Sequence, residues 1–217
     1  MEHLSTIQIF AVWALPVLFA ITVHEVAHGW VASWFGDKTA FILGRLTLNP
    51  AKHIDLLGTI LIPGTLLLLG GPVFGWAKPV PINSFNLRHP KRDMALIALA
   101  GPLANLAMAF IWGGITKLGM ILLSYSFPGA LAISYMGEAG ISINVVLIVL
   151  NLLPLPPLDG GHVLMGLLPK NISAKVSRVA PFGFFILLAL LAFGFLGAII
   201  EPWARFLHGA VVAVWSL

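Results

Sequence analysis

The sequence predicts an all-α polytopic membrane protein with about five transmembrane helices, a re-entrant or half-buried segment and a short β-hairpin-like element. Two observations predict this class. Hydrophobic residues make up 59% of the 217 residues and charged residues only 9%, whereas a soluble domain is usually about a quarter charged. The apolar residues also gather in stretches long enough to cross a bilayer. This balance excludes a water-soluble globular enzyme and a disordered chain.

Five apolar segments are the expected helices. The first lies at about residues 5–35 and is long enough to span with some tilt. The others lie at about residues 93–120, 139–153, 181–200 and 202–217. Asp93 is typical of a helix N-cap. The start, Met1-Glu2-His3, lacks the basic residues of a signal peptide, so we expect the first segment to be retained.

Two shorter segments do not fit a simple helix. Residues 56–76 are apolar but are broken by Pro63-Gly64 and by Gly70-Gly71-Pro72, which favours a re-entrant or half-buried element. Residues 41–48 read FILGRLTL, in which apolar residues partly alternate with Arg45 and Thr47. That alternation predicts a strand or hairpin.

Domain organisation and partners are predicted from composition. No repeat or long linker divides the chain, so we expect a single domain over 1–217, with a core at about 5–165 and additional C-terminal helices at about 180–217. The chain has no cysteine, which excludes disulfides, cysteine zinc sites and a thiol nucleophile. The net charge is +4, with basic residues scattered over short loops, so we expect a lipid bilayer and no nucleic acid as partner.

The strongest chemical motif is His24-Glu25-Val26-Ala27-His28. On a helix, positions i and i+4 share a face, so one metal ion can reach both imidazoles. Glu25 lies beside them and can take a proton from a water molecule that the metal polarises. Histidine and glutamate inside a membrane helix are costly and are by default functional. The motif therefore predicts a metal site with an adjacent base.

A catalytic zinc usually has three protein ligands, so the two histidines need a partner. Asp159 is the candidate, because it follows an apolar segment in the sequence Leu158-Asp159-Gly160-Gly161. Alone, an Asp-Gly-Gly sequence is more typical of a turn or a helix cap. Because the sequence also contains a histidine pair, we favour Asp159 as the third metal ligand.

These motifs resemble those of the site-2 protease family of intramembrane zinc metalloproteases. The resemblance rests on HEVAH at 24–28 and NLLPLPPLDGG at 151–161, and extends to GPLAN at 101–105. GRLTLNPAKHID at 45–55 and GWAKPVP at 75–81 are similar to loops of compact prokaryotic members. The similar stretches cover about residues 20–165, and we expect no PDZ or CBS domain.

The resemblance implies roles for individual residues. His24, His28 and Asp159 would bind one zinc ion per chain, Glu25 would be the general base, and Asn151 would help to hold the substrate. The implied activity is an endopeptidase that cuts transmembrane segments of membrane proteins, as in regulated intramembrane proteolysis.

Several assignments stay open at this point. Asn105, after Gly101-Pro102, either packs between helices or lines the cavity, and we keep it as a substrate-binding candidate. His162 either supports Asp159 or is a surface residue, and neither His53 nor His89 is expected to be a ligand. A helical substrate must unwind before cleavage, and residues 41–48 are a candidate edge for holding it by strand addition.

Two other functions fit a membrane metal site. A metal transporter would need ligands strung across the bilayer, whereas the candidates here cluster at one level. A non-catalytic metal-binding protein would not need Glu25. The sequence does not indicate the oligomeric state or the identity of the substrate.

The position of the ligands constrains the topology. His24 and His28 lie toward the C-terminal end of the first segment, and Asp159 lies just past the end of segment 139–153. The two segments must run in the same direction for these residues to meet, so an odd number of crossings separates them. Segment 93–120 is one crossing, and residues 56–76 should therefore not cross completely.

Loop charge agrees with this topology. Ten of the twelve basic residues then fall on one side: Lys38, Arg45, Lys52, Lys78, Arg88, Lys91, Arg92, Lys170, Lys175 and Arg178. The positive-inside rule makes this side cytoplasmic. We expect a multi-pass protein of the cell membrane, of prokaryotic plasma-membrane type, with its N-terminus outside and its metal site nearer the cytoplasmic face.

Overall fold

The computed structural model describes residues 4–68 and 75–217, and this part of the chain is mainly helical with no strand. Three of its helices are long and apolar enough to cross a membrane: α1 (Thr6–Trp34), α4 (Pro90–Ser124) and α5 (Ala130–Asn151). A fourth crossing results if α7 (Lys170–Ser177) and α8 (Ala180–Ala192), bent by 59°, form one span. The helical membrane class is therefore supported, with three or four of the expected spans.

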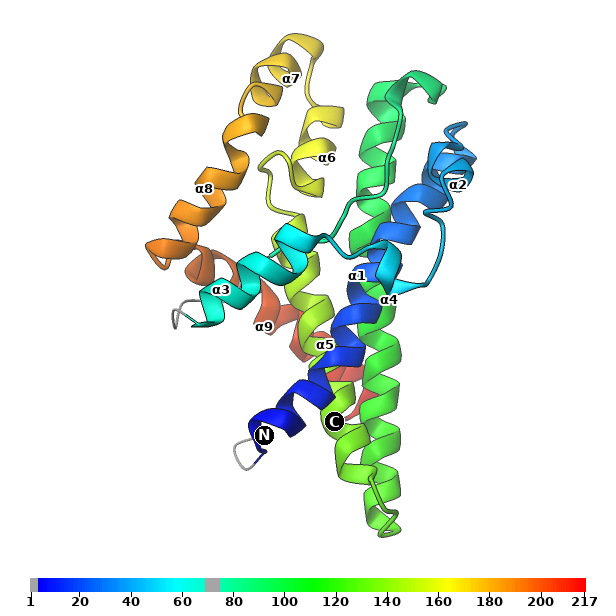
Figure 1. Ribbon diagram of the computed structural model, residues 1–217, viewed down its shortest axis with the longest axis vertical. Helices are drawn as coiled ribbons and strands as arrows, with labels where there is room; N and C mark the ends of the chain where they lie inside the picture. Colours follow the sequence, from blue (N-terminus) through cyan, green and yellow to red (C-terminus); the bar gives the residue numbers. More distant parts are fainter. Residues whose placement is uncertain (1–3, 69–74) are drawn as a thin grey trace.

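Helix α4 is the centre of the molecule and packs against α1, α5 and α6 (Asp159–Leu167) (Figure 1). Small residues let α5 approach it closely. A Cβ atom at Gly140 would lie 2.2 Å from the Trp112 ring, and one at Gly137 would lie 2.5 Å from the Thr116 amide nitrogen. Close backbone approach at glycine is a common basis of helix association in membranes. The apolar core on this side contains Ala109, Trp112, Ile141, Val145 and Val211.

The C-terminal helices differ from the prediction. The expected segments 181–200 and 202–217 are instead divided at Gly194, between α8 and α9 (Phe195–Trp215). Gly194 has φ +75°, in the left-handed region that ends a helix and that glycine adopts without strain. Helix α9 continues through Pro202. A membrane helix tolerates an internal proline more readily than a soluble one.

The start of α4 also differs from the prediction. The helix begins at Pro90, where the missing N–H costs no helical hydrogen bond. Asp93, expected as the N-cap, lies in the first turn, and its Oδ2 accepts the backbone N–H of His89 at 2.7 Å. The carboxylate therefore reaches back to the cap residue instead of occupying that position.

Residues 35–89 connect α1 to α4 through short elements. These are α2 (Thr39–Ile42), η1 (Pro50–Lys52), the π-helical turn η2 (Leu56–Leu61), α3 (Ile62–Leu68) and η3 (Ser84–Asn86). In Figure 1 the connection passes beside α1 before it reaches the start of α4. It thus brings irregular backbone close to the helix that carries the histidine motif.

The β-hairpin-like element expected at residues 41–48 is not present. Asp37 accepts hydrogen bonds from both the backbone N–H and the hydroxyl of Thr39, which starts a helical turn instead of a strand. Gly44, at φ +62°, follows that turn. The N–H of Leu43 donates to Thr39, and the N–H of Arg45 donates to Ala40. The amides of the first half of the segment are therefore used within a turn, and no strand forms in residues 41–48. A role of this segment in holding a substrate stays a prediction.

The two described ends of the expected re-entrant segment lie together. The N–H of Trp76 donates to the carbonyl of Gly58 at 3.0 Å, and the Thr59 hydroxyl donates to the carbonyl of Trp76 at 2.8 Å. Residues 69–74, including Gly70-Gly71-Pro72, lie outside the described part. The contact between the beginning and the end of the segment is what a segment that does not cross the membrane completely should show, and the re-entrant topology stays a prediction.

Candidate metal centre and active site

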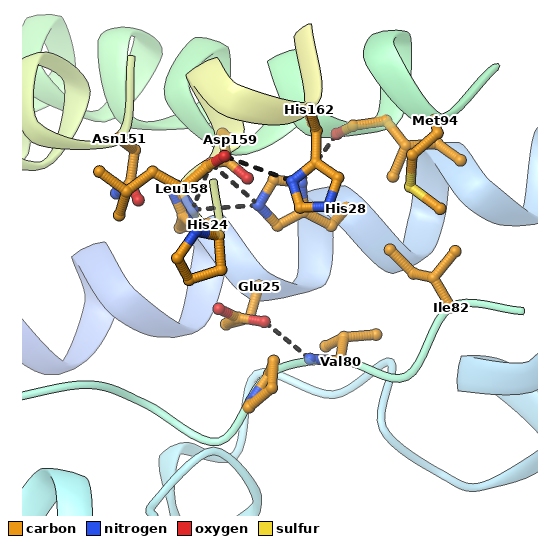
Figure 2. Close-up of a pocket in the computed structure, with 14 residues that line it drawn as sticks. His24, Glu25, His28, Val80, Ile82, Met94, Asn151, Leu158, Asp159 and His162 are labelled. Carbon is orange, nitrogen blue, oxygen red and sulfur yellow. Dashed lines mark hydrogen bonds and ion pairs between the residues drawn. The ribbon is translucent and has the colours of Figure 1, made fainter. Parts of the chain in front are cut away.

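Three side chains from two helices meet at one point. His24 and His28 come from successive turns of α1, and Asp159 is the first residue of α6. The two Nε2 atoms are 3.0 Å apart, and Asp159 Oδ2 lies 3.2 Å from that of His24 and 3.4 Å from that of His28. Within the described part of the chain, they are the group of side chains that could hold a metal ion. Figure 2 shows them facing one another.

This triangle has the dimensions of a zinc site. Ligands about 2.0–2.1 Å from a tetrahedral zinc ion lie about 3.3 Å from one another, close to the three observed distances. Asp159 Oδ2 is buried and accepts no hydrogen bond within the described residues. A buried oxygen without a donor is costly, and a cation between the three atoms would satisfy it.

The far side of each imidazole fixes its orientation. His28 Nδ1 lies 2.7 Å from the carbonyl oxygen of Ile97, which can only accept, so Nδ1 carries the proton. His24 Nδ1 makes a hydrogen bond with Oδ1 of Asn105. Both Nε2 lone pairs therefore point into the triangle. Such outer contacts set the tautomer and position of metal-binding histidines.

Asn105 is itself fixed by a network of buried amides. Its Nδ2 donates to the carbonyl of Ala20 at 3.2 Å and to Oδ1 of Asn144 at 2.7 Å. Asn144 Nδ2 in turn donates to the carbonyl of Gly140 at 2.8 Å. Because both Asn105 donors are used, its Oδ1 is the atom left to accept from His24. The network joins α4 to α1 and α5.

Space for the imidazoles comes from a glycine. A Cβ atom at Gly101 of α4 would lie 2.5 Å from both His24 Cε1 and His28 Nε2. On the other wall, a Cβ atom at Gly160 would lie 2.3 Å from the carbonyl oxygen of Leu152. Glycine at these two positions lets α4 and the start of α6 come close enough to close the triangle.

Glu25 lies beside the triangle without joining it. Its Oε2 accepts the backbone N–H of Val80 at 2.8 Å, and it lines a cavity of about 370 Å³ together with all three triangle residues. Figure 2 shows its carboxylate between the imidazoles and the chain at Val80. A carboxylate in this place can accept a proton from a water molecule in the cavity.

Other residues of the cavity wall extend the site. Asn151, at the end of α5, lines it with its Nδ2 donating to the carbonyl of Leu147 at 3.0 Å. His162, one turn beyond Asp159, also lines it, with Nδ1 3.3 Å from the carbonyl of Leu158. Figure 2 shows the two on opposite sides of Asp159. The remaining lining is largely apolar and includes Ile82, Met94 and Ile97.

Comparison with known proteins agrees with this chemistry. The model of peptidase family M50 matches residues 118–191, a stretch that includes Asp159. The protein named "Putative zinc metalloprotease YwhC" of Bacillus subtilis is 41% identical over 180 residues, covering 81% of this chain and 78% of its own length. The chain belongs to peptidase family M50.

Further relatives of this family M50 member carry similar names. Proteins named "Putative zinc metalloprotease Rip2" from Mycolicibacterium smegmatis and Mycobacterium tuberculosis strain H37Rv are 31% and 28% identical. They match 87% and 91% of this chain and 69% and 70% of their own lengths. No solved structure matches the chain significantly. The relatives support zinc as the metal and the resemblance to site-2 proteases.

The structure of this family M50 member separates the two asparagine candidates. Asn151 reaches the cavity, as a substrate-binding residue must, and its role stays a prediction. Asn105 is fully buried behind His24, and its position favours orienting that ligand over touching a substrate. Neither His53, which lies against the carbonyl of Thr47, nor His89, the N-cap of α4, joins the triangle.

Four contacts of the site were not anticipated from the sequence. They involve the Ile97 carbonyl, Asn144, the glycine at 101 and the Val80 amide. The first and last are backbone groups, which any residue type supplies. Asn144 in an apolar segment and glycine in Gly101-Pro102 did carry a signal, but one that fits ordinary helix packing equally well.

Proposed function

We propose that this protein is a zinc-dependent intramembrane endopeptidase that hydrolyses peptide bonds within or near transmembrane segments of membrane proteins. One observation carries the proposal: a zinc-sized triangle of two histidines and an aspartate shares a cavity with a glutamate that is not part of the triangle. The cavity lies between helices that are themselves apolar enough to span a bilayer. We further propose one zinc ion per chain and a role in regulated intramembrane proteolysis.

The proposed roles follow from the chemistry of each group. His24, His28 and Asp159 would hold the zinc ion, which when bound would polarise a water molecule and the scissile carbonyl. Glu25 Oε2 is occupied by the Val80 amide, so Oε1 would accept the proton of the attacking water. The same carboxylate would then deliver that proton to the leaving amide nitrogen. Asn151 would position the substrate backbone at the edge of the cavity.

The membrane setting explains the form of the cavity. Hydrolysis needs water, and a bilayer core supplies almost none, so the protein must enclose a polar space of its own. In a helical substrate, each carbonyl is hydrogen-bonded to an amide four residues on. A segment must therefore unwind locally before its carbonyl can enter the cavity. Helix-destabilising residues near the cleavage point should accordingly favour cleavage.

The proposal is tested by zinc content and cleavage in detergent-purified protein. Glu25→Gln should keep about one zinc ion per chain and lower the rate on a single-span reporter by about 10²–10⁴-fold. His24→Ala and Asp159→Ala should lose both zinc and cleavage, since each removes a ligand. Cleavage at the parent rate by Glu25→Gln would contradict the role of the base. Unchanged zinc in Asp159→Ala would contradict the ligand set.

A non-catalytic metal-binding or metal-transporting protein is the alternative. Transport would need further ligands along a path, and the described residues contain a single cluster of three. The parent protein in the same assays distinguishes the two functions, because zinc binding or zinc flux without any cleavage by the parent would favour the alternative.

We propose that the metal site lies nearer the cytoplasmic face of a prokaryotic plasma membrane, with the N-terminus outside. The support is the gathering of ten basic residues in loops that the topology places on one side. Protease-accessible tags at the N-terminus and in the loop at residues 76–89 should report opposite sides. Both tags on the same side would contradict this orientation.

A further inference from the structure

Residues 76–83 form an extended strap that runs along the active site. They have no regular secondary structure, and they follow the re-entrant segment and precede η3. Figure 2 shows the strap on the opposite side of Glu25 from the zinc triangle. Pro79, Val80 and Ile82 of the strap line the cavity. The strap therefore forms the wall against which the proposed base rests.

Both ends of the strap are tied to fixed parts of the molecule. At its start, the N–H of Lys78 donates to the carbonyl of His53 at 2.9 Å, and Arg45 Nη2 donates to the carbonyl of Lys78, also at 2.9 Å. At its end, the N–H of Asn83 donates to Oδ2 of the buried Asp37 at 2.7 Å. With both ends held, the middle of the strap has little freedom to move relative to α1.

The middle of the strap carries a single backbone donor. The sequence from residue 78 to 82 is Lys-Pro-Val-Pro-Ile, and proline has no N–H. Between Lys78 and Ile82, Val80 thus supplies the one amide, and that amide donates to Glu25 at 2.8 Å. A hydrogen bond from an amide to a carboxylate is charge-assisted and stronger than a neutral one. The flanking prolines leave this stretch without a further backbone donor.

The side chain of Val80 fixes the distance between the strap and α1. Val80 is buried and packs over Gly29, one helical turn beyond Glu25. A Cβ atom at position 29 would lie 2.8 Å from Val80 Cγ1 and 2.5 Å from Leu46 Cδ2. Glycine at this position lets the strap approach the helix closely enough for the amide to reach the carboxylate.

We infer that the Val80 amide is a positioning donor for Glu25, and this inference rests on the proposed function. It holds Oε2 of the carboxylate at the cavity wall and so leaves Oε1 turned toward the water and the substrate. The donor acts through Glu25 and touches neither zinc nor substrate. A carboxylate without this restraint would sample rotamers in which its oxygen is too far from the water to accept a proton, since small misplacements are costly in catalysis.

The test compares Val80→Pro, which removes the amide proton, with Val80→Ala, which trims the side chain but keeps the proton. Each variant is measured for zinc per chain and for kcat and KM on a single-span peptide in detergent. Relative to Val80→Ala, we expect Val80→Pro to lower kcat about 10–100-fold, with zinc and KM unchanged within about threefold. A kcat equal to that of Val80→Ala would overturn the inference.

A second arm separates positioning from general distortion. In a Glu25→Asp background the shorter carboxylate cannot reach the Val80 amide, so adding Val80→Pro should change the remaining rate less than threefold. An equal loss in both backgrounds would show that the strap acts on something other than Glu25 and would overturn the inference. If Val80→Pro fails to bind zinc, Gly29→Ala, which pushes the strap away from α1, replaces it in both arms with the same expectations.

The inference and the proposed function fail differently. A parent protein that binds zinc but cleaves no peptide refutes the proposed function before any strap variant is made. A parent that cleaves, together with a Val80→Pro variant that cleaves as well as Val80→Ala, refutes the positioning donor alone.

Discussion

Helices α1, α4 and α5 meet through apolar packing, close contacts at glycine and a short network of buried amides, whereas the connection at residues 35–89 also depends on a carboxylate that accepts several hydrogen bonds. Trp112 fits over Gly140 in the first region, while Asp37 in the second accepts hydrogen bonds from Thr39, Asn83 and Asn86. The helices position the three side chains proposed to bind zinc. The connection positions the strap beside Glu25, the proposed base. If these roles hold, metal binding and proton transfer depend on parts of the chain that can be disturbed separately.

The largest effect is expected in the helical region, from Gly101→Ala. The new Cβ atom would overlap both imidazoles, so we expect zinc affinity to fall at least about 100-fold because the ligands can no longer meet at one ion. Zinc titration of metal-stripped protein measures this affinity. Gly209→Ala is the control, because no atom lies within 4 Å of a Cβ there. Parent-like zinc affinity in Gly101→Ala would show that the triangle is not the metal site.

A smaller loss is expected one contact further from the metal. Asn105→Leu removes the acceptor that fixes His24 Nδ1, and losses of this kind typically weaken metal binding about 10–100-fold. The same zinc titration measures the effect, with Leu118→Ala on the exposed face of α4 as control. Should substrate KM rise with zinc affinity unchanged, Asn105 would be a substrate contact after all.

The smallest effect should come from Asp37→Ala in the connection, which leaves several donors unpaired and should lower the free energy of unfolding by about 1–3 kcal/mol. Burial alone would raise the pKa of Asp37, but the hydrogen bonds from Thr39, Asn86 and Asn83 outweigh it and hold the pKa below its usual 3.8. Its folded-state pKa is depressed, so its contribution is full above 3.8 and is lost as pH falls through the lower value.

Thermal unfolding in detergent between pH 7 and pH 3 checks this prediction. The difference in Tm between the parent and Asp37→Ala should be largest near neutral pH and should shrink toward pH 3. Glu201→Gln is the control, since that carboxylate is 64% exposed and its removal should matter little. Zinc binding in Asp37→Ala should stay near the parent value. A loss of zinc would mean that the two regions are not separable.

The two regions also differ in how well the sequence predicts them. The His24–His28 pair follows from helical periodicity alone, which is local. The choice of Asp159 rests on its place in Leu158-Asp159-Gly160-Gly161 and on the need for a third ligand, and the direction of the two segments is then deduced from that choice. The structure brings Asp159 to the histidine pair. The positions of α1, α4 and the end of α5 were predictable because apolar segments in a bilayer must be helical.

What escaped prediction has local causes in two cases and a contact between distant residues in the third. Apolar and polar residues alternate in 41–48 as in a strand, but Asp37 accepts two hydrogen bonds from Thr39 and a helical turn starts there. The break at Gly194 is hidden in a continuous apolar run, since many glycines in membrane helices lie in the interior. The contact of Val80 could not be predicted from the sequence, because its backbone amide and not its side chain makes it.

The chain of buried amides from His24 through Asn105 and Asn144 also has a consequence for assembly of the protein. Sliding α4 by a single residue along α1 moves it 1.5 Å, enough to break the bonds to His24 and Ala20 and strand polar atoms in an apolar interior. Apolar side chains alone would tolerate such a slip. The buried amides thus favour one alignment of the three helices, and in that alignment His24, His28 and Asp159 meet at one point.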